Sequence, residues 1–202
     1  MGRFSAGGHF VGLRNLPHAA TSLMQAVRRK LTGTIPRLPW IPFSANRALD
    51  ARLSKSSRVW EVGAGYSTLW LADRVGKLTS IEASEEWYQR LSRIIAGEGL
   101  KNVDLRHVWA ADAMSNFDEL ADGELDLLFI DGGPRDVCLK NGWRKVRKNG
   151  MLYLDNWENA EFWNDARDWV ARNRNLFSRE EYFVDYVPAQ VGVYEGAILT
   201  LA

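Results

Sequence analysis

The 202-residue sequence contains a single cysteine, Cys138, and no long run of apolar residues. One cysteine cannot form an internal disulfide, so nothing ties the fold to an oxidising compartment, and a cytoplasmic location is the default expectation. A helix that crosses a membrane needs about 18 consecutive apolar residues. Because Arg14, Asn15 and His18 interrupt the apolar residues near the start, the sequence predicts neither a membrane span nor a secretory signal.

Acidic residues are missing from the first 49 positions, where seven lysines and arginines occur. The rest of the chain contains 19 basic and all 25 acidic residues, so the net charge of +1 combines a basic amino-terminal arm with an acidic body. This balance excludes a binder that presents a basic surface throughout, and no nucleic-acid partner is expected.

With 46% hydrophobic and 25% charged residues, the composition is that of a globular protein and excludes collagen-like or largely disordered chains. The length fits one α/β domain with a short appendage. We therefore divide the chain into an arm, residues 1–42, and a domain, residues 43–202. The sequence does not indicate an oligomeric state.

The arm is predicted to contain an amphipathic helix over residues 17–31, followed by a proline-containing strap. Leu23, Val27 and Leu31 fall on one helical face, and the basic residues 28–30 occupy the last turn. Two interpretations stay open. The favoured one packs the apolar face on the domain, where helix and strap contribute to acceptor selection; the other makes it a peripheral contact with an anionic membrane surface.

From residue 43 onward, helical and extended patterns alternate. The predicted strands cover residues 58–62, 78–82, 103–109, 125–130 and 151–155. The predicted helices cover residues 44–54, 67–74, 85–96, 113–120, 136–147 and 159–172. Five strand–helix units predict a mainly parallel sheet with helices on both faces. Two further strands, 182–187 and 193–201, are joined by only five residues, which predicts an antiparallel hairpin at the sheet edge.

The turn after the first of these strands contains Gly63 and Gly65, at the position where open α/β sheets bind nucleosides. A dinucleotide-binding fingerprint would have a third glycine where Thr68 stands, and no lysine or arginine lies nearby to hold a pyrophosphate. Glu61, at the end of the strand, would repel a phosphate and attract a cationic or amine-bearing ligand.

Two more acids follow strands at regular intervals. Glu82 ends the second strand, where an acidic side chain can bind both hydroxyls of a ribose. Asp112 follows the third strand and is placed to meet an adenine amino group.

In this order, the motifs resemble those of the class I S-adenosylmethionine-dependent methyltransferases over residues 58–202. The resemblance implies a Rossmann-like, doubly wound, mainly parallel seven-stranded sheet with a C-terminal antiparallel hairpin, and S-adenosyl-L-methionine as cofactor. Ser67 stands where many members of the family have a third glycine. The cofactor-binding residues implied are Glu61, Gly63, Ala64, Gly65, Ser67, Glu82, Ala83, Asp112, Ala113 and Asp131.

Asp131 after the fourth strand, with Asp155 and Asn156 after the fifth, is similar to the divalent-cation site of catechol-type O-methyltransferases. These oxygen ligands suit Mg²⁺ or another hard divalent cation. Alternatively, Asn156 caps the helix over 159–172 and Asp131 binds backbone or cofactor. Residues 132–135, Gly-Gly-Pro-Arg, depart from the continuation common in that group. Asp131 and Asp155 are the candidates for a catalytic base.

The resemblance therefore implies methyl transfer to a small-molecule acceptor, with oxygen favoured over nitrogen or carbon. The alternatives are a non-catalytic cofactor-binding protein that docks on a membrane or partner through its arm, and a NAD-dependent oxidoreductase. The three histidines and Cys138 are expected to be structural. Four aromatic residues are expected to wall an acceptor pocket or to belong to the core: Trp40, Tyr66, Trp157 and Trp163.

Overall fold

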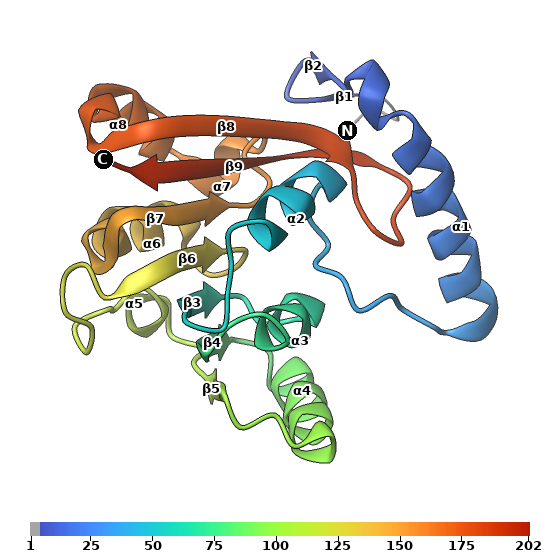
Figure 1. Ribbon diagram of the computed structural model, residues 1–202, viewed down its shortest axis with the longest axis horizontal. Helices are drawn as coiled ribbons and strands as arrows, with labels where there is room; N and C mark the ends of the chain where they lie inside the picture. The colour runs from blue at the N-terminus through green and yellow to red at the C-terminus, as the bar shows by residue number, and fades with distance from the viewer. Residues whose placement is uncertain (1–4) are drawn as a thin grey trace.

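All seven predicted strands of the central sheet form, although several begin or end at other residues than predicted. The computed structural model describes residues 5–202, and its sheet has the order β5-β4-β3-β6-β7-β9-β8 (Figure 1). The first five strands are mutually parallel, and β9 runs antiparallel to both of its neighbours. Their bounds are β3 Arg58–Val62, β4 Lys77–Glu82, β5 Val103–His107, β6 Leu125–Ile130, β7 Val146–Leu154, β8 Phe177–Tyr186 and β9 Val193–Leu201. The predicted fold class is confirmed.

Helices cover both faces of this sheet, as the strand–helix alternation predicts (Figure 1). Their bounds are α1 Pro17–Thr32, α2 Phe43–Asp50, α3 Tyr66–Ala72, α4 Glu85–Glu98, α5 Ala111–Met114, α6 Arg135–Gly142, α7 Ala160–Trp163 and α8 Ala166–Arg172. Short 3-10 turns lie at Leu13–Asn15, Trp143–Lys145 and Arg174–Leu176.

Alternate side chains of the inner strands feed two separate cores. Ile130 and Leu154 face α5 to α8, whereas Phe129 and Tyr153 face α2 and α3. All four side chains are fully buried, and the rings of Phe129 and Tyr153 stack with centroids 4.6 Å apart. A strand buried on both faces shows an almost continuous apolar run, which is why β6 was predicted with its observed bounds.

The predicted helix over 159–172 is interrupted, and its cap is not the residue expected. Asn164, with φ +35°, separates α7 from α8. The side chain of Asn159 accepts a hydrogen bond from the backbone N–H of Glu161 and caps α7, so the capping role considered for Asn156 is wrong. In place of the predicted helix over 113–120 the structure has only α5, which begins two residues earlier and ends at Met114, and β7 and β8 begin earlier than predicted.

The β8–β9 hairpin closes the sheet and supports the arm. A two-strand ribbon, β1 Ser5–Ala6 with β2 His9–Phe10, was not predicted, and Ala6 packs against Tyr186 and Val193 of the hairpin. The end of β8 and the start of β9 therefore lie at the same edge as the carboxyl ends of the parallel strands. The division of the chain at residue 42 stays a prediction.

Helix α1 forms where predicted, but the favoured packing of its apolar face is wrong. Leu23, Val27 and Leu31 are 52%, 48% and 78% exposed, so this face is not buried against the domain. Polar side chains on the other face make the contacts with the hairpin. Within residues 5–202, no helix is long and apolar enough to cross a membrane.

The turn after β3 requires glycine at position 63, which generates a prediction for stability. Gly63 has φ +93°, and a Cβ there would lie 2.7 Å from the backbone nitrogen of Gly132. We expect Gly63→Ala to lower the free energy of unfolding by about 2–4 kcal/mol, because left-handed strain adds to a backbone clash.

Gly97→Ala is the matched control for urea unfolding, because a Cβ at this helical position has open space. It should raise stability by about 0.5–1 kcal/mol. If Gly63→Ala unfolds at the same urea concentration as wild type, position 63 does not require glycine.

Candidate functional site

A cavity of ≈ 340 Å³ opens at the carboxyl ends of β3 and β4. Seven of the ten predicted cofactor residues line it: Gly63, Ala64, Gly65, Ser67, Glu82, Ala83 and Asp131. The wall is completed by Trp40, Tyr66, Trp87, Met114, Gly132 and Gly133. Among the described residues, none that lines this cavity is a lysine or arginine. The structure therefore gathers predicted residues from three separate motifs around one cavity.

Three of the predicted residues do not line the cavity. Glu61 is fully buried at the end of β3. Asp112 and Ala113 belong to α5, and Asp112 lines a neighbouring hollow with Ser115 and Asn116. The contact of Asp112 with an adenine amino group stays a prediction.

Glu61 organises the glycine turn from below. Its Oε2 accepts hydrogen bonds from Thr68 Oγ1 at 2.7 Å and Ser80 Oγ at 2.6 Å. Thr68 Oγ1 in turn accepts from the backbone N–H of Gly65 at 3.0 Å. Thr68, which breaks the dinucleotide fingerprint, thus links the carboxylate to the turn.

The second oxygen of Glu61, Oε1, is buried and has no hydrogen-bond partner within the described part of the chain. Burial is the largest cause that raises the pKa of Glu61 to about 7, against hydrogen bonds that favour the charged form. A buried carboxylate oxygen without a donor is costly, and this cost favours the protonated form of Glu61, in agreement with its raised pKa.

Glu82 presents its carboxylate to the cavity. Oε1 accepts a hydrogen bond from the backbone N–H of Ser84 at 2.7 Å, which fixes the side chain. Partial burial raises the pKa of Glu82. A carboxylate held this way can accept both hydroxyl hydrogens of a ribose.

Aromatic rings form the outer wall. Trp40 and Tyr66 stack with centroids 6.1 Å apart, and Trp87 meets Tyr66 edge-on at 6.1 Å. Electron-rich ring faces attract cations, and two arginines already lie over these rings: the Cζ of Arg29 is 4.7 Å from the Trp40 centroid, and that of Arg90 is 5.1 Å from the Trp87 centroid. Trp40 and Tyr66 were considered for the acceptor pocket, whereas Trp87 was missed.

Beside this cavity, an arginine joins the predicted catalytic residues. Asp131 and Asp155 follow the neighbouring strands β6 and β7, and Arg135 begins α6. Arg135 Nη2 donates to Asp131 Oδ1 at 3.1 Å, and its Nη1 donates to Asn156 Oδ1 at 3.3 Å and lies 3.6 Å from Asp155 Oδ2. Arg135 also donates to the backbone carbonyls of Asp131 and Asp155, at 2.7 Å and 2.6 Å.

The crowding of carboxylates changes how these groups bind protons. Burial first, and then the negative charge of Asp155, raise the pKa of Asp131 well above its usual range, while Arg135 opposes the shift. Tyr153 donates its hydroxyl to Asp155 Oδ1 at 2.9 Å, and burial raises the pKa of Tyr153 as well. The raised pKa makes the Asp131 carboxylate a stronger base than an ordinary aspartate.

The predicted metal ligands are brought together, with Arg135 between them, and their role as ligands of a divalent cation stays a prediction. The guanidinium of Arg135 binds oxygens of Asp131, Asp155 and Asn156, which are the atoms such an ion would need. Residues 5–202 contain no cluster of three or more histidine, cysteine, aspartate or glutamate side chains placed to hold a metal ion. The sequence signal for this ion pair was Arg135 itself, because the segment that contains it, residues 132–135, departs from the continuation common in the metal-binding group.

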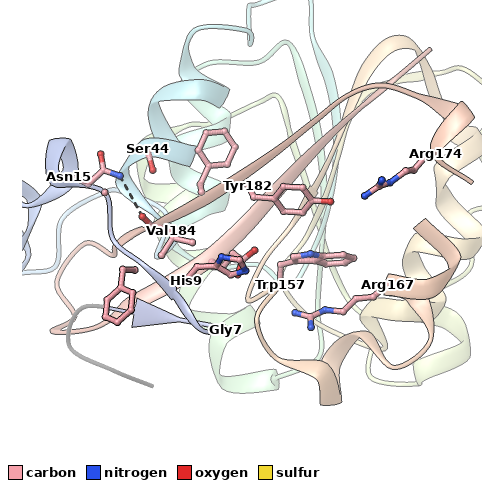
Figure 2. Close-up of a pocket in the computed structure, with 13 residues that line it drawn as sticks. Gly7, His9, Asn15, Ser44, Trp157, Arg167, Arg174, Tyr182 and Val184 are labelled. Carbon is pink, nitrogen blue, oxygen red and sulfur yellow. Dashed lines mark hydrogen bonds between the residues drawn. The ribbon is translucent and has the colours of Figure 1, made fainter. Parts of the chain in front are cut away.

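A second cavity of ≈ 730 Å³ lies at the same edge, over β8 and β9 (Figure 2). Trp157 lies between Tyr182 and Arg167, whose Cζ is 5.3 Å from the Trp157 ring centroid (Figure 2). Residues of the arm, including His9 and Asn15, form the opposite wall (Figure 2). The lining residues are Gly7, His9, Phe10, Gly12, Asn15, Ser44, Trp157, Arg167, Arg174, Tyr182, Phe183, Val184 and Glu195.

Other residues named from the sequence have structural surroundings. Cys138 and Trp163 are fully buried in the core under α6 to α8. His107 contacts Glu85 through Nδ1 at 2.8 Å, and His18 contacts the buried Asp185 at 2.9 Å. These placements agree with the structural roles expected for Cys138, His107 and His18, whereas His9 lines the second cavity.

Comparison with known proteins associates this architecture with methyl transfer. A family model described as "Methyltransferase domain" matches residues 60–157. A protein of Mycobacterium sp. (strain JLS) named "Putative O-methyltransferase" is 39% identical over 114 residues, which cover 52% of this chain and 50% of that protein. The chain spans half of that relative and 61% of a Mycobacterium bovis relative of the same name.

Solved structures show the same fold at low sequence identity. An O-methyltransferase from Bacillus cereus, in complex with S-adenosylhomocysteine, is 16% identical with a TM-score of 0.63, covering 90% of each chain. An rRNA methylase from Streptococcus thermophilus is 15% identical with a TM-score of 0.60, covering 78% of this chain and 93% of that one. The fold is shared by enzymes that act on different acceptors.

The contacts of Arg135 predict how the acidic pair responds to metal ions. Wild-type protein should bind no Mn²⁺ at these aspartates, because the guanidinium of Arg135 already contacts both of them. Arg135→Met leaves the two carboxyl groups without this counter-charge, and we expect it to bind Mn²⁺, measured as loss of the electron paramagnetic resonance signal of the free ion.

Lys140→Met is the control, because Lys140 lies on the same helix but pairs with the exposed Asp165. It should bind no more Mn²⁺ than wild type. Mn²⁺ binding by the wild type that is abolished by Asp155→Asn would support the predicted metal site instead.

Proposed function

We propose that this chain, whose sheet and motifs are those of a class I S-adenosylmethionine-dependent methyltransferase, transfers a methyl group from S-adenosylmethionine to an oxygen of a small-molecule acceptor. One observation carries the proposal. The glycine-lined cavity after β3 and β4 presents the Glu82 carboxylate and aromatic faces, and none of its described lining residues is basic. That set suits a ribose and a cationic, amine-bearing ligand, and it does not suit a pyrophosphate.

The chemistry of S-adenosylmethionine is displacement at a methyl carbon bonded to a sulfonium. In such a reaction most of the rate enhancement can come from holding the acceptor oxygen in line. Glu82 and the glycine turn would fix the cofactor, and the ring faces of Trp40 and Tyr66 would favour the charged form. Asp131 lines the cavity and belongs to the pair with Asp155. It would receive the proton that the acceptor hydroxyl loses.

The alternatives fit the residues less well. A NAD-dependent oxidoreductase needs a phosphate-binding turn, and the third position of that turn is Thr68, whose hydroxyl is bound to Glu61. A non-catalytic cofactor-binding protein would not need two carboxylates held beside the cavity by Arg135. The O-methyltransferase names of the relatives favour oxygen over other acceptor atoms.

The second cavity is our candidate for the acceptor. Neighbouring strands lie about 4.8 Å apart, so two strand spacings separate the end of β6 from β9, about 10 Å. An acceptor whose hydroxyl reaches Asp131 would therefore place its other end over Glu195 and Trp157. The arm lines this cavity, which supports the expectation that it contributes to acceptor selection.

The chemistry of this cavity favours an aromatic acceptor with an anionic group. Trp157 and Tyr182 offer ring faces with centroids 6.5 Å apart. Arg167 Nε is buried and has no hydrogen-bond partner within residues 5–202. Burial raises the pKa of Glu195, the one acid of the lining, which weakens its ability to neutralise Arg167.

We also infer a cytoplasmic location, because the chain has one cysteine and it is buried.

Binding of S-adenosylhomocysteine by calorimetry tests the cofactor assignment. Wild-type protein should bind it, and Glu82→Ala should weaken binding by about 1.5–3 kcal/mol, because charge-assisted hydrogen bonds to the ribose are lost. Glu86→Ala, an exposed acid in the first turn of α4, is the control and should bind as wild type does. Tight NAD binding without S-adenosylhomocysteine binding would refute the proposal.

The acceptor cavity is tested with 3-(4-hydroxyphenyl)propanoate, which has a phenolic oxygen and a carboxylate at opposite ends, and with its primary amide. In the presence of S-adenosylhomocysteine, the acid should bind wild type, and Arg167→Gln should raise its dissociation constant about tenfold or more. Arg172→Gln, on the same helix but outside the lining, should leave it unchanged. Equal affinity for acid and amide would exclude recognition of the anion, and tighter binding of the matching amine would assign recognition to Glu195.

A further inference from the structure

Helix α1 is attached to the protein by its polar face. His18 Nδ1 contacts Asp185 at 2.9 Å, Ser22 Oγ donates to the backbone carbonyl of Val187 at 2.9 Å, and Gln25 Oε1 accepts from the backbone N–H of Ala189 at 3.1 Å. The guanidinium of Arg29 lies over the Trp40 ring, 4.7 Å from its centroid. Positions 18, 22, 25 and 29 are three or four residues apart and therefore share one side of the helix.

The apolar side of α1 faces away from the domain. At 100° per residue, Leu23, Val27 and Leu31 form a stripe about 100° wide that also includes Leu16 and Met24. All five side chains are exposed, and Met24 is 66% exposed. Within the described residues this stripe packs against no hydrophobic cluster. Soluble amphipathic helices normally show the opposite arrangement, with the apolar stripe against the core.

Basic side chains border the stripe on both sides. On the same helical projection, Arg28 and Lys30 fall on opposite flanks of the line through Leu23 and Val27. On this projection neither residue falls on the side of the helix that makes the polar contacts with the hairpin. No aspartate or glutamate occurs in the first 49 residues, so the stripe and its cations have no acidic partner within the arm.

We propose that the outward face of α1 docks this protein on the surface of a lipid bilayer that contains anionic headgroups. A helix in the bilayer interface buries an apolar stripe among the acyl chains while flanking lysine and arginine side chains reach the headgroups. The face composed of Leu16, Leu23, Met24, Val27 and Leu31, bordered by Arg28 and Lys30, has this arrangement. Docking needs no rearrangement, because the polar contacts of α1 with the β8–β9 hairpin stay in place.

Charge favours a bilayer over a second copy of this chain. Two copies that joined through this stripe would bring their Arg28 and Lys30 side chains together at the rim of one contact, and the arm offers no acid to pair with them. An anionic surface instead pairs with every one of these cations. The proposal is independent of the methyltransferase assignment, because it uses only residues of the arm.

Co-sedimentation of the full chain with vesicles tests the proposal. Vesicles of phosphatidylcholine with phosphatidylserine should bind the protein at low salt, and vesicles of phosphatidylcholine alone should bind it much less. Raising NaCl from about 0.03 M to about 0.5 M should release it, because the Debye length falls severalfold. The double substitution Leu23→Gln and Val27→Gln should lower the vesicle partition coefficient about tenfold or more.

Two further variants separate the parts of this surface. Arg28→Gln with Lys30→Gln should lose the preference for phosphatidylserine and much of the salt dependence. Trp109→Gln is the control, because Trp109 is 77% exposed but lies outside the arm, and it should bind vesicles as wild type does. Thermal unfolding of each variant reports whether the fold is intact; the substituted side chains are exposed, so melting should change little.

The outcomes of these experiments distinguish between a lipid bilayer and a second copy of this chain as the partner of the apolar stripe. Wild-type binding to phosphatidylserine vesicles that the arm variants lose supports the proposal. Failure of the wild type to bind at low salt, or equal binding by the Leu23→Gln and Val27→Gln variant, overturns it. A dimer in sedimentation velocity that the same variant dissociates, without vesicle binding, would instead assign the stripe to contact between copies of this chain.

Discussion

The guanidinium of Arg135 holds together two carboxylates that the parallel sheet forces into contact. Asp131 and Asp155 follow adjacent strands, so their side chains emerge at the same edge within one strand spacing. Both would repel each other if nothing positive lay between them. Arg135 binds both side chains and both backbone carbonyls, and thereby fixes the loops after β6 and β7. The cavity after β3 and β4 lies on one side of these loops, and the second cavity, over β8 and β9, lies on the other. Both depend on the positions of the loops.

The close approach of two loops shapes the wall of the cavity after β3 and β4. Gly63 and Gly132 meet across the ends of β3 and β6, and neither position leaves space for a Cβ. Below them, Glu61 ties the turn to α3 through Thr68. The buried oxygen that Glu61 keeps free and the raised pKa of Asp131 are consequences of the same packing, because carboxylates are held where water cannot reach them fully.

The β8–β9 hairpin connects the arm to the site. It supplies Tyr182 and Glu195 to the second cavity, and it also supplies the buried Asp185 that anchors α1 through His18. The strap after α1 then brings Trp40 into the wall of the cofactor cavity, with Arg29 over its ring. A surface that holds α1 at a bilayer would therefore also hold both cavities at a defined distance from that bilayer.

The sequence by itself determined the sheet and the order of its motifs. Strands buried on both faces, such as β6, show as apolar runs, and the residues that follow them must gather at one edge, which is why most predicted cofactor residues line one cavity. Only the tertiary structure decided the partner of the two aspartates. The sequence contained Arg135, but that its guanidinium lies between the two aspartates depended on where α6 begins. The direction of the apolar face of α1 was also undetermined, because periodicity defines a stripe without saying which side of the helix meets the protein. Hydrogen bonds to the β8–β9 hairpin, from residues more than 150 positions away, settled that orientation.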